Sequence, residues 1–120
     1  MTNIVRLRHD VDATTEMKPS NYNAPEMFTS DDHTELDYVF FRSSDESILS
    51  GVWETAPCKA EVESYPVNEL FVIISGSVTL TNTDGQSDTF TSGDAFFIPK
   101  GTTFTWENTE TLRKYYMIAS

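Results

Sequence analysis

The sequence is poor in cysteine, in positive charge and in long apolar runs. Its single cysteine, Cys58, excludes an intrachain disulfide, and the adjacent Lys59 points away from it on an extended chain. We therefore expect Cys58 to be an accessible or half-buried turn residue rather than a nucleophile. Only eight lysines and arginines oppose 19 aspartates and glutamates, which gives a formal net charge of −11. Such a surface repels phosphate backbones and anionic lipids, so neither nucleic acid nor membrane is an expected partner.

The sequence also lacks an apolar segment long enough to span a bilayer, and no apolar run follows the two arginines near the start. Without a recognisable export signal, the expected location is the cytoplasm. The 120 residues include eight Phe, five Tyr and two Trp, and 38% of the residues are hydrophobic. That is enough apolar material for one folded domain with one core.

No stretch of useful length has helical periodicity. Residues 1–34 are polar and interrupted by Pro19 and Pro25, which indicates an irregular arm with at most one short strand. Residues 35–120 contain short apolar or alternating runs separated by turn residues, and Asp84-Gly85 is typical of a tight hairpin. The expected strands are 36–41, 48–55, 60–65, 70–75, 77–81, 87–91, 95–98, 102–106 and 112–118. This pattern predicts an all-β sandwich or barrel.

Two spaced sets of residues narrow the fold. Glu69 stands seven residues before Gly76, while Gly93 stands six before Pro99, which stands two before Gly101. With this spacing the chain resembles the cupin superfamily. The resemblance implies a double-stranded β-helix, that is, a jelly-roll barrel, over residues 35–120, preceded by the arm of residues 1–34.

Within that superfamily the chain resembles the small single-domain branch related to the ureidoglycine aminohydrolase cupin domain, over roughly residues 48–118. The matching elements are Gly51-Val52-Trp53-Glu54, Pro57, Lys59, Tyr65-Pro66, Glu69, residues 93–99, Thr105-Trp106-Glu107 and Arg113-Lys114-Tyr115-Tyr116. Asn108, like Gly93, Pro99 and Gly101, matches a fixed position of the second cupin motif. A cupin barrel hosts many activities, so this resemblance alone assigns none.

The resemblance also identifies where metal-binding cupins carry their ligands, commonly histidines with one glutamate. In this sequence those positions are Glu63, Tyr65, Glu69 and Phe104, so only the glutamate is kept. A phenylalanine cannot bind a metal, and the remaining oxygen donors suit only a hard cation such as Mn or Mg. We expect no cofactor, with a weakly held divalent metal as the alternative. His9 and His33 fall in the arm, where we expect solvated side chains.

Alternation places several aromatic and acidic side chains on the face that the resemblance makes the barrel interior. Glu69 is the candidate catalytic residue: in an aromatic pocket it acts as an acid or base, or it only accepts structural hydrogen bonds. The candidate ligand-binding residues are Trp53, Lys59, Glu63, Tyr65, Glu69, Phe104, Trp106 and Tyr115. For the aromatic residues the alternative is core packing. Lys59 either pairs with Glu69 or faces solvent, and Arg113 and Lys114 are expected to bind surface carboxylates.

Three functions are compatible with these residues. The first is binding of a small polar metabolite in the barrel, which the lost histidines favour. The second is an enzyme of the ureidoglycine aminohydrolase or isomerase type, with Glu69 as acid or base. The third is an interaction protein. Because jelly-roll edge strands commonly pair between subunits, we expect a homodimer.

Overall fold

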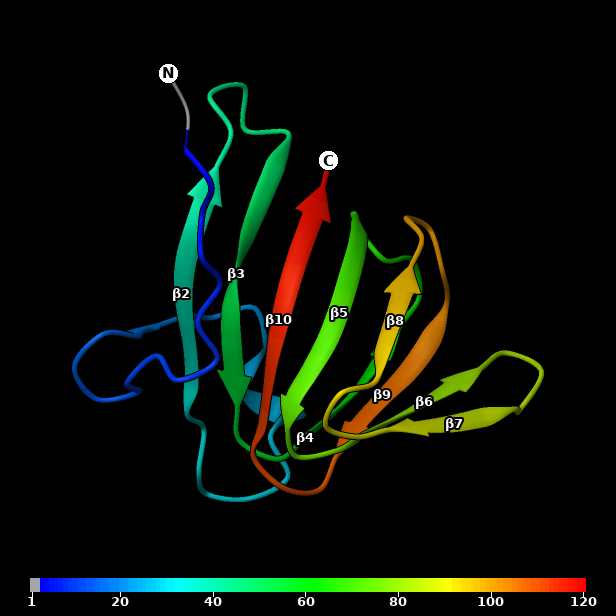
Figure 1. Ribbon diagram of the computed structural model, residues 1–120. Helices are drawn as coiled ribbons and strands as arrows, with labels where there is room; N and C mark the ends of the chain where they lie inside the picture. Colours follow the sequence, from blue (N-terminus) through cyan, green and yellow to red (C-terminus); the bar gives the residue numbers. More distant parts are fainter. Residues whose placement is uncertain (1–2) are drawn as a thin grey trace.

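Two antiparallel sheets face each other in the computed structural model, which describes residues 3–120 (Figure 1). The larger sheet has the order β1-β2-β3-β10-β5-β8 and the smaller one β4-β9-β6-β7. The strands are β1 (Lys18–Pro19), β2 (Glu35–Arg42), β3 (Ile48–Thr55), β4 (Cys58–Val62), β5 (Asn68–Ser75), β6 (Val78–Asn82), β7 (Ser87–Phe90), β8 (Ala95–Ile98), β9 (Phe104–Asn108) and β10 (Leu112–Ala119). The described residues contain one short 3-10 helix, η1 (Pro25–Met27), and no α-helix. The all-β prediction is therefore confirmed, and the two-sheet arrangement is consistent with a jelly roll.

Alternation along the central strands places the core between the sheets. In β5, Glu69, Phe71 and Ile73 are buried, while the residues between them are more exposed. In β9, Phe104 and Trp106 are buried in the same way. Because successive side chains of a strand point to opposite faces, these residues meet in the space between the two sheets. Phe71, Ile73, Phe104 and Trp106 belong to one apolar cluster that also contains side chains of β3, β4, β6, β8 and β10.

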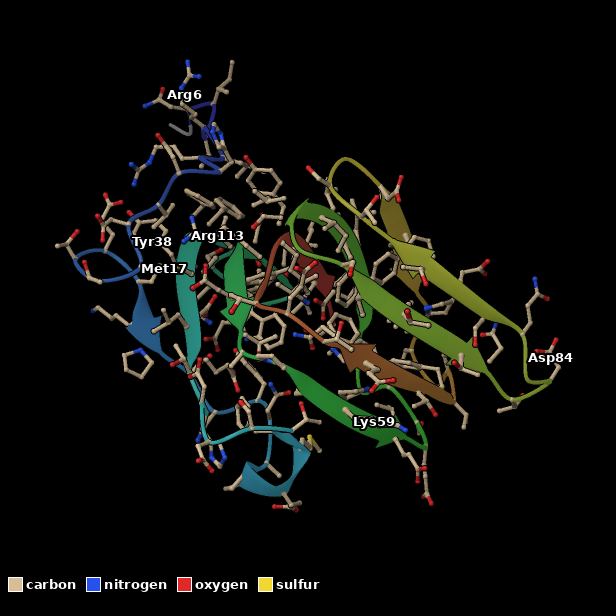
Figure 2. The ribbon with its side chains drawn as sticks, turned by 90° about the horizontal axis from the view of Figure 1, so that it is seen from below. Arg6, Met17, Tyr38, Lys59, Asp84 and Arg113 are labelled. Atoms are coloured by element: carbon tan, nitrogen blue, oxygen red, sulfur yellow. The ribbon has the colours of Figure 1, made fainter. Side chains whose placement is uncertain are left out.

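Residues 11–17 of the arm pack on the outer face of the larger sheet. Val11 and Met17 are buried against Val52, whose side chain points away from the space between the sheets. Arg113 of β10 binds Glu54 at 2.9 Å and donates to the backbone oxygen of Val11 at 2.7 Å. Figure 2 shows Met17 and Arg113 close to this part of the arm. The boundary between arm and domain at residue 34 stays a prediction, but residues 11–17 are firmly attached to the sheet.

The turns follow the sequence signals. Asp84-Gly85 closes the β6–β7 hairpin, in which the Asn82 amide donates to the Gln86 carbonyl at 2.8 Å. This hairpin extends beyond the rest of the molecule, with Asp84 at its tip (Figures 1 and 2). Gly76, between β5 and β6, has φ of 82°, and a Cβ there would collide with the carbonyl oxygen of Thr111. Only glycine fits that reversal.

Cys58 differs from the expectation of an accessible or half-buried turn residue. Pro57 does interrupt the chain, but pairing resumes at once, because Cys58 is the first residue of β4 and lies opposite Asn108. Its thiol is completely buried and donates to Asn108 Oδ1 at 3.1 Å. Burial raises the pKa of the Cys58 thiol, which disfavours the reactive thiolate.

None of the helical structure in residues 3–120 has the length and apolar character needed to cross a bilayer.

Candidate ligand-binding site

A cavity of about 280 Å³ lies between the two sheets. Its walls are mainly aromatic and come from β3, β5, β9, β10 and the β4–β5 loop: Trp53, Tyr65, Phe71, Phe104, Trp106 and Tyr116. Several of these rings contact one another, including Trp53 with Trp106, whose centroids are 6.3 Å apart in an edge-to-face arrangement. An aromatic cavity with few polar groups is the usual form of a small-molecule site.

The polar part of the cavity is a buried ion pair with a phenol beside it. Lys114 Nζ lies 2.8 Å from Glu69 Oε2, and Tyr65 donates its hydroxyl proton to Glu69 Oε1 at 2.7 Å. The side chains of Lys114 and Glu69 are only 7% and 5% exposed. Tyr65 is held in place by its backbone, which exchanges hydrogen bonds with Gly101 and Thr102 of the β8–β9 loop. Both carboxylate oxygens of Glu69 therefore already have a partner.

The ammonium of Lys114 is surrounded by aromatic faces. Its Nζ atom lies 3.6 Å from the ring centroid of Phe71 and 4.7 Å from that of Trp53. Cation–π attraction at such distances compensates part of the lost hydration. Burial nevertheless lowers the pKa of Lys114 below its ordinary value, although the charge of Glu69 acts in the opposite direction.

A second hydrogen bond fixes another cavity wall. Tyr116 donates to Asp37 Oδ1 at 2.7 Å, which joins β10 to β2 across β3. The ring fits because position 51 is glycine: a Cβ on Gly51 would lie 2.6 Å from the Tyr116 hydroxyl. Burial raises the pKa of Tyr116 and of Tyr65, and adjacent carboxylates add to both shifts. Burial also raises the pKa of Asp37.

The arm completes the cavity through Glu35. This buried carboxylate accepts hydrogen bonds from the amides of Tyr22 and Asn23 at 2.9 and 2.8 Å, from the hydroxyl of Ser20, and from Trp53 Nε1 at 3.1 Å. Tyr22 and Asn23 in turn line the cavity. Glu35 thus connects the arm to an aromatic wall of the site. Residues 20–23 have no periodic pattern from which this contact could be predicted.

Comparison with known proteins now identifies the family. The family model described as the EutQ-like cupin domain matches residues 42–116, which is more than half of the chain. This chain belongs to the EutQ-like cupin domain family. No curated protein matches it.

Solved structures agree with this cupin assignment. A protein of unknown function in the DUF861 family, from Pseudomonas syringae pv. tomato, is 26% identical with a TM-score of 0.79; the alignment covers 91% of this chain and 46% of that one. A DUF861 protein from Thermotoga maritima is 32% identical over 54% of this chain and 73% of its own, with a TM-score of 0.50. Clostridium difficile EutQ, at 21% identity and a TM-score of 0.59, covers 72% and 68% and supports the fold. The cupin chain spans less than half the length of the Pseudomonas protein.

Five of the sequence-predicted site residues line the cavity of this cupin domain: Trp53, Tyr65, Glu69, Phe104 and Trp106. Whether they bind a ligand stays a prediction. Glu69 itself points inward and is buried.

Three of the predicted residues lie elsewhere. Lys59 is exposed on the outer side of β4, as Figure 2 shows, because the inward positions of this strand are 58, 60 and 62. Glu63 is exposed just after β4 ends. Tyr115 lies on the outer face of the larger sheet, and its hydroxyl donates to the Leu7 carbonyl at 3.4 Å. A shift of one position along β10 separates Tyr115 from the cavity-lining Tyr116.

The prediction for Lys114 was also wrong. We expected it to bind a surface carboxylate, but in this cupin domain it is buried and pairs with Glu69, whereas Arg113 does bind a carboxylate, that of Glu54. A signal was available: Leu112, Lys114 and Tyr116 share one face of β10, and the leucine and tyrosine are apolar enough to mark that face as internal.

The residues at the family's metal positions do not fit a metal ion. Glu63 faces away from the cavity, Phe104 has no donor atom, and Tyr65 and Lys114 use the two oxygens of Glu69. Within residues 3–120, no group of three or more His, Cys, Asp or Glu side chains is placed to hold a metal. His9 and His33 are exposed, as expected. We therefore derive no chemistry through a metal.

Proposed function

We propose that this cupin domain binds a small molecule whose polar head group contacts Lys114 and Glu69. The observation that supports the proposal is a buried ion pair that opens into an aromatic cavity. A cavity of about 280 Å³ is near the lower limit of small-molecule sites, roughly 300 Å³. The ligand is therefore a compact metabolite.

The pair favours a head group that both accepts and donates hydrogen bonds. The ammonium of Lys114 has three N–H donors, of which Glu69 receives one, so a carbonyl or carboxylate oxygen can accept another. The carboxylate of Glu69 has further lone pairs for an N–H donor. Amides, ureido compounds and small acids meet these conditions. The resemblance to the ureidoglycine aminohydrolase cupin domain supports the amide and ureido classes.

Acid–base catalysis on the same ligand is the second candidate. One observation favours it: Glu69 is within hydrogen-bond distance of two proton-bearing groups, the Tyr65 hydroxyl and the Lys114 ammonium. A carboxylate with such neighbours can pass a proton to or from a bound ligand. An isomerase or a hydrolase of C–N bonds would use this arrangement.

Binding can be tested by thermal unfolding with a panel of small amides, ureido compounds and carboxylic acids. A true ligand at 100 times its Kd stabilises the fold by about 2.7 kcal/mol and raises Tm by several degrees. Ala60 lines the cavity, so Ala60→Met should fill it and abolish the shift. Lys59→Met, which adds the same side chain on the outer side of β4, should leave the shift unchanged. A panel without any shift, or equal shifts in both variants, would overturn the proposal.

A further inference from the structure

We propose that Lys114 forms a reversible imine with a small aldehyde or ketone bound in the cavity. This inference rests on the proposed function, because the carbonyl compound must first enter the ligand cavity.

Lys114 differs from the other lysines in position. The chain contains four, and Lys18, Lys59 and Lys100 are all exposed. Only Lys114 is buried, and only its side chain lines the cavity. A carbonyl compound in the cavity therefore meets a single amine. Its small remaining exposure fits a group that a compact ligand reaches and bulk water does not.

Compared with a lysine in water, Lys114 has surroundings that favour the neutral, nucleophilic form of its amine. Burial disfavours the ammonium and lowers the pKa of Lys114, although cation–π attraction to the rings of Phe71 and Trp53 offsets part of this effect. The carboxylates of Glu69, Asp37 and Glu35 act in the opposite direction, Glu69 most strongly. A desolvated lysine in an apolar pocket is a recognised way to activate an amine for Schiff-base formation.

Glu69 can handle the proton in each step. Its Oε2 atom, 2.8 Å from Nζ, takes a proton from the ammonium and leaves a free lone pair. That pair forms the N–C bond while the carbonyl π pair moves to oxygen, which takes the proton back from the carboxyl group. Glu69 then removes a second proton from nitrogen, which gives a neutral carbinolamine.

Loss of water completes the reaction. The protonated Glu69 gives its proton to the carbinolamine hydroxyl, the C–O bond breaks and water leaves. The nitrogen lone pair forms the C=N bond, so the product is a protonated imine paired with the Glu69 carboxylate. No oxidant or reductant is consumed. The Tyr65 hydroxyl, which donates to the other oxygen of Glu69, positions that carboxylate during both transfers.

The test is reductive trapping with benzaldehyde and sodium cyanoborohydride at pH 7, followed by peptide mass spectrometry. Cyanoborohydride donates hydride to the imine and fixes the adduct. The three exposed lysines are internal controls in the unmodified protein, so no variant has to fold. At limiting aldehyde we expect benzylation of Lys114 at least tenfold above that of Lys59 or Lys100. Equal modification of all four lysines would overturn the proposal.

Two variants and one analogue complete the design. Lys114→Arg keeps the charge and should remove the adduct, while Glu69→Gln should slow its formation at least tenfold, with folding checked by circular dichroism. Benzyl alcohol has the same ring but no carbonyl group, so a rise in Tm reports entry alone. A rise with benzyl alcohol but no Lys114 adduct overturns the imine and leaves the ligand site standing. Absence of both overturns the imine and the ligand cavity together.

Discussion

The ammonium of Lys114 on β10 and the carboxylate of Glu69 on β5 are 2.8 Å apart, although 45 positions separate them in the sequence. Removing one member of a buried pair leaves an uncompensated charge, which costs about 3–5 kcal/mol. We expect Lys114→Met and Glu69→Gln each to lower the free energy of unfolding by about that amount in urea titrations. The double variant should lose less than the two single losses together.

The solvent-accessible pair of Arg8 and Glu16, also 2.8 Å apart, is the matched control. Arg8→Met should lower the free energy of unfolding far less than either buried substitution, because solvent screens surface ion pairs. Strict additivity of Lys114→Met and Glu69→Gln would contradict the coupling between the two groups.

Tyr65 and Tyr116 should make stability fall at alkaline pH. Their pKa values are raised in the folded state, so above about pH 10 the unfolded chain releases protons that the folded chain keeps. Stability is full below that pH and is lost as pH rises further. In native protein, the phenolate absorbance at 295 nm should lack the contribution of both residues. Tyr65→Phe should leave the rise in 295 nm absorbance of the native protein unchanged, and it should reduce that rise only in the unfolded protein. A smaller rise in the native variant would show that Tyr65 ionises in the folded state.

Replacement of Glu35 should loosen residues 20–23 of the arm. Glu35→Gln loses the negative charge that accepts from the Tyr22 and Asn23 amides and from Trp53. Hydrogen bonds to a charged group contribute about 1.5–3 kcal/mol each, so we expect a loss of at least 2 kcal/mol. Hydrogen exchange at residues 22 and 23 should accelerate. The control is Glu26→Gln, at an exposed position of η1, which should change neither the free energy of unfolding nor the exchange rate. Unaltered exchange in Glu35→Gln would show that other contacts hold residues 22 and 23.

The homodimer expected from the sequence stays a prediction, and the structure offers a surface for it. Phe41, Ser50, Met117, Leu70 and Phe97 are successive cross-strand partners over five strands of the larger sheet. Directly paired residues share a face, so they form one row, in which Phe97, Met117 and Phe41 are 54%, 41% and 39% exposed. A second copy would cover this apolar row.

Light scattering should then give twice the chain mass of 13.6 kDa. The combined change Phe97→Lys and Met117→Lys should give monomers that remain folded, whereas Thr89→Lys on β7 should leave the dimer intact. A monomeric mass for the unmodified chain would refute this arrangement.

The strands could be predicted because their signals are local. Alternation in residues 69–73 and the Asp84-Gly85 turn specify direction and reversal without reference to the rest of the chain. Glu69 was found through the cupin resemblance, and alternation then placed it on the same face as Phe71.

The remaining features depend on distant partners. The face shared with Leu112 and Tyr116 indicates that Lys114 is internal, but no local pattern reveals which carboxylate on another strand its amine reaches. The burial of Cys58 requires Asn108, and the wall formed by Tyr22 and Asn23 requires Glu35. Sheet topology brings these partners together, and the local sequence around one residue does not determine that topology.

Gly51 and Tyr116 have a consequence for the evolution of this domain. The Tyr116 ring occupies the space that a side chain at position 51 would need, and its hydroxyl then reaches Asp37. A Cβ at position 51 would also collide with the backbone carbonyl oxygen of Tyr38, so relatives should keep glycine there whatever residue occupies position 116. Relatives with a tyrosine at position 116 should keep an acid at 37, whereas relatives with a smaller residue at 116 are free to vary position 37. Substitutions at positions 37 and 116 should therefore be correlated across lineages, and that correlation would trace how the cavity was reshaped as the family diversified.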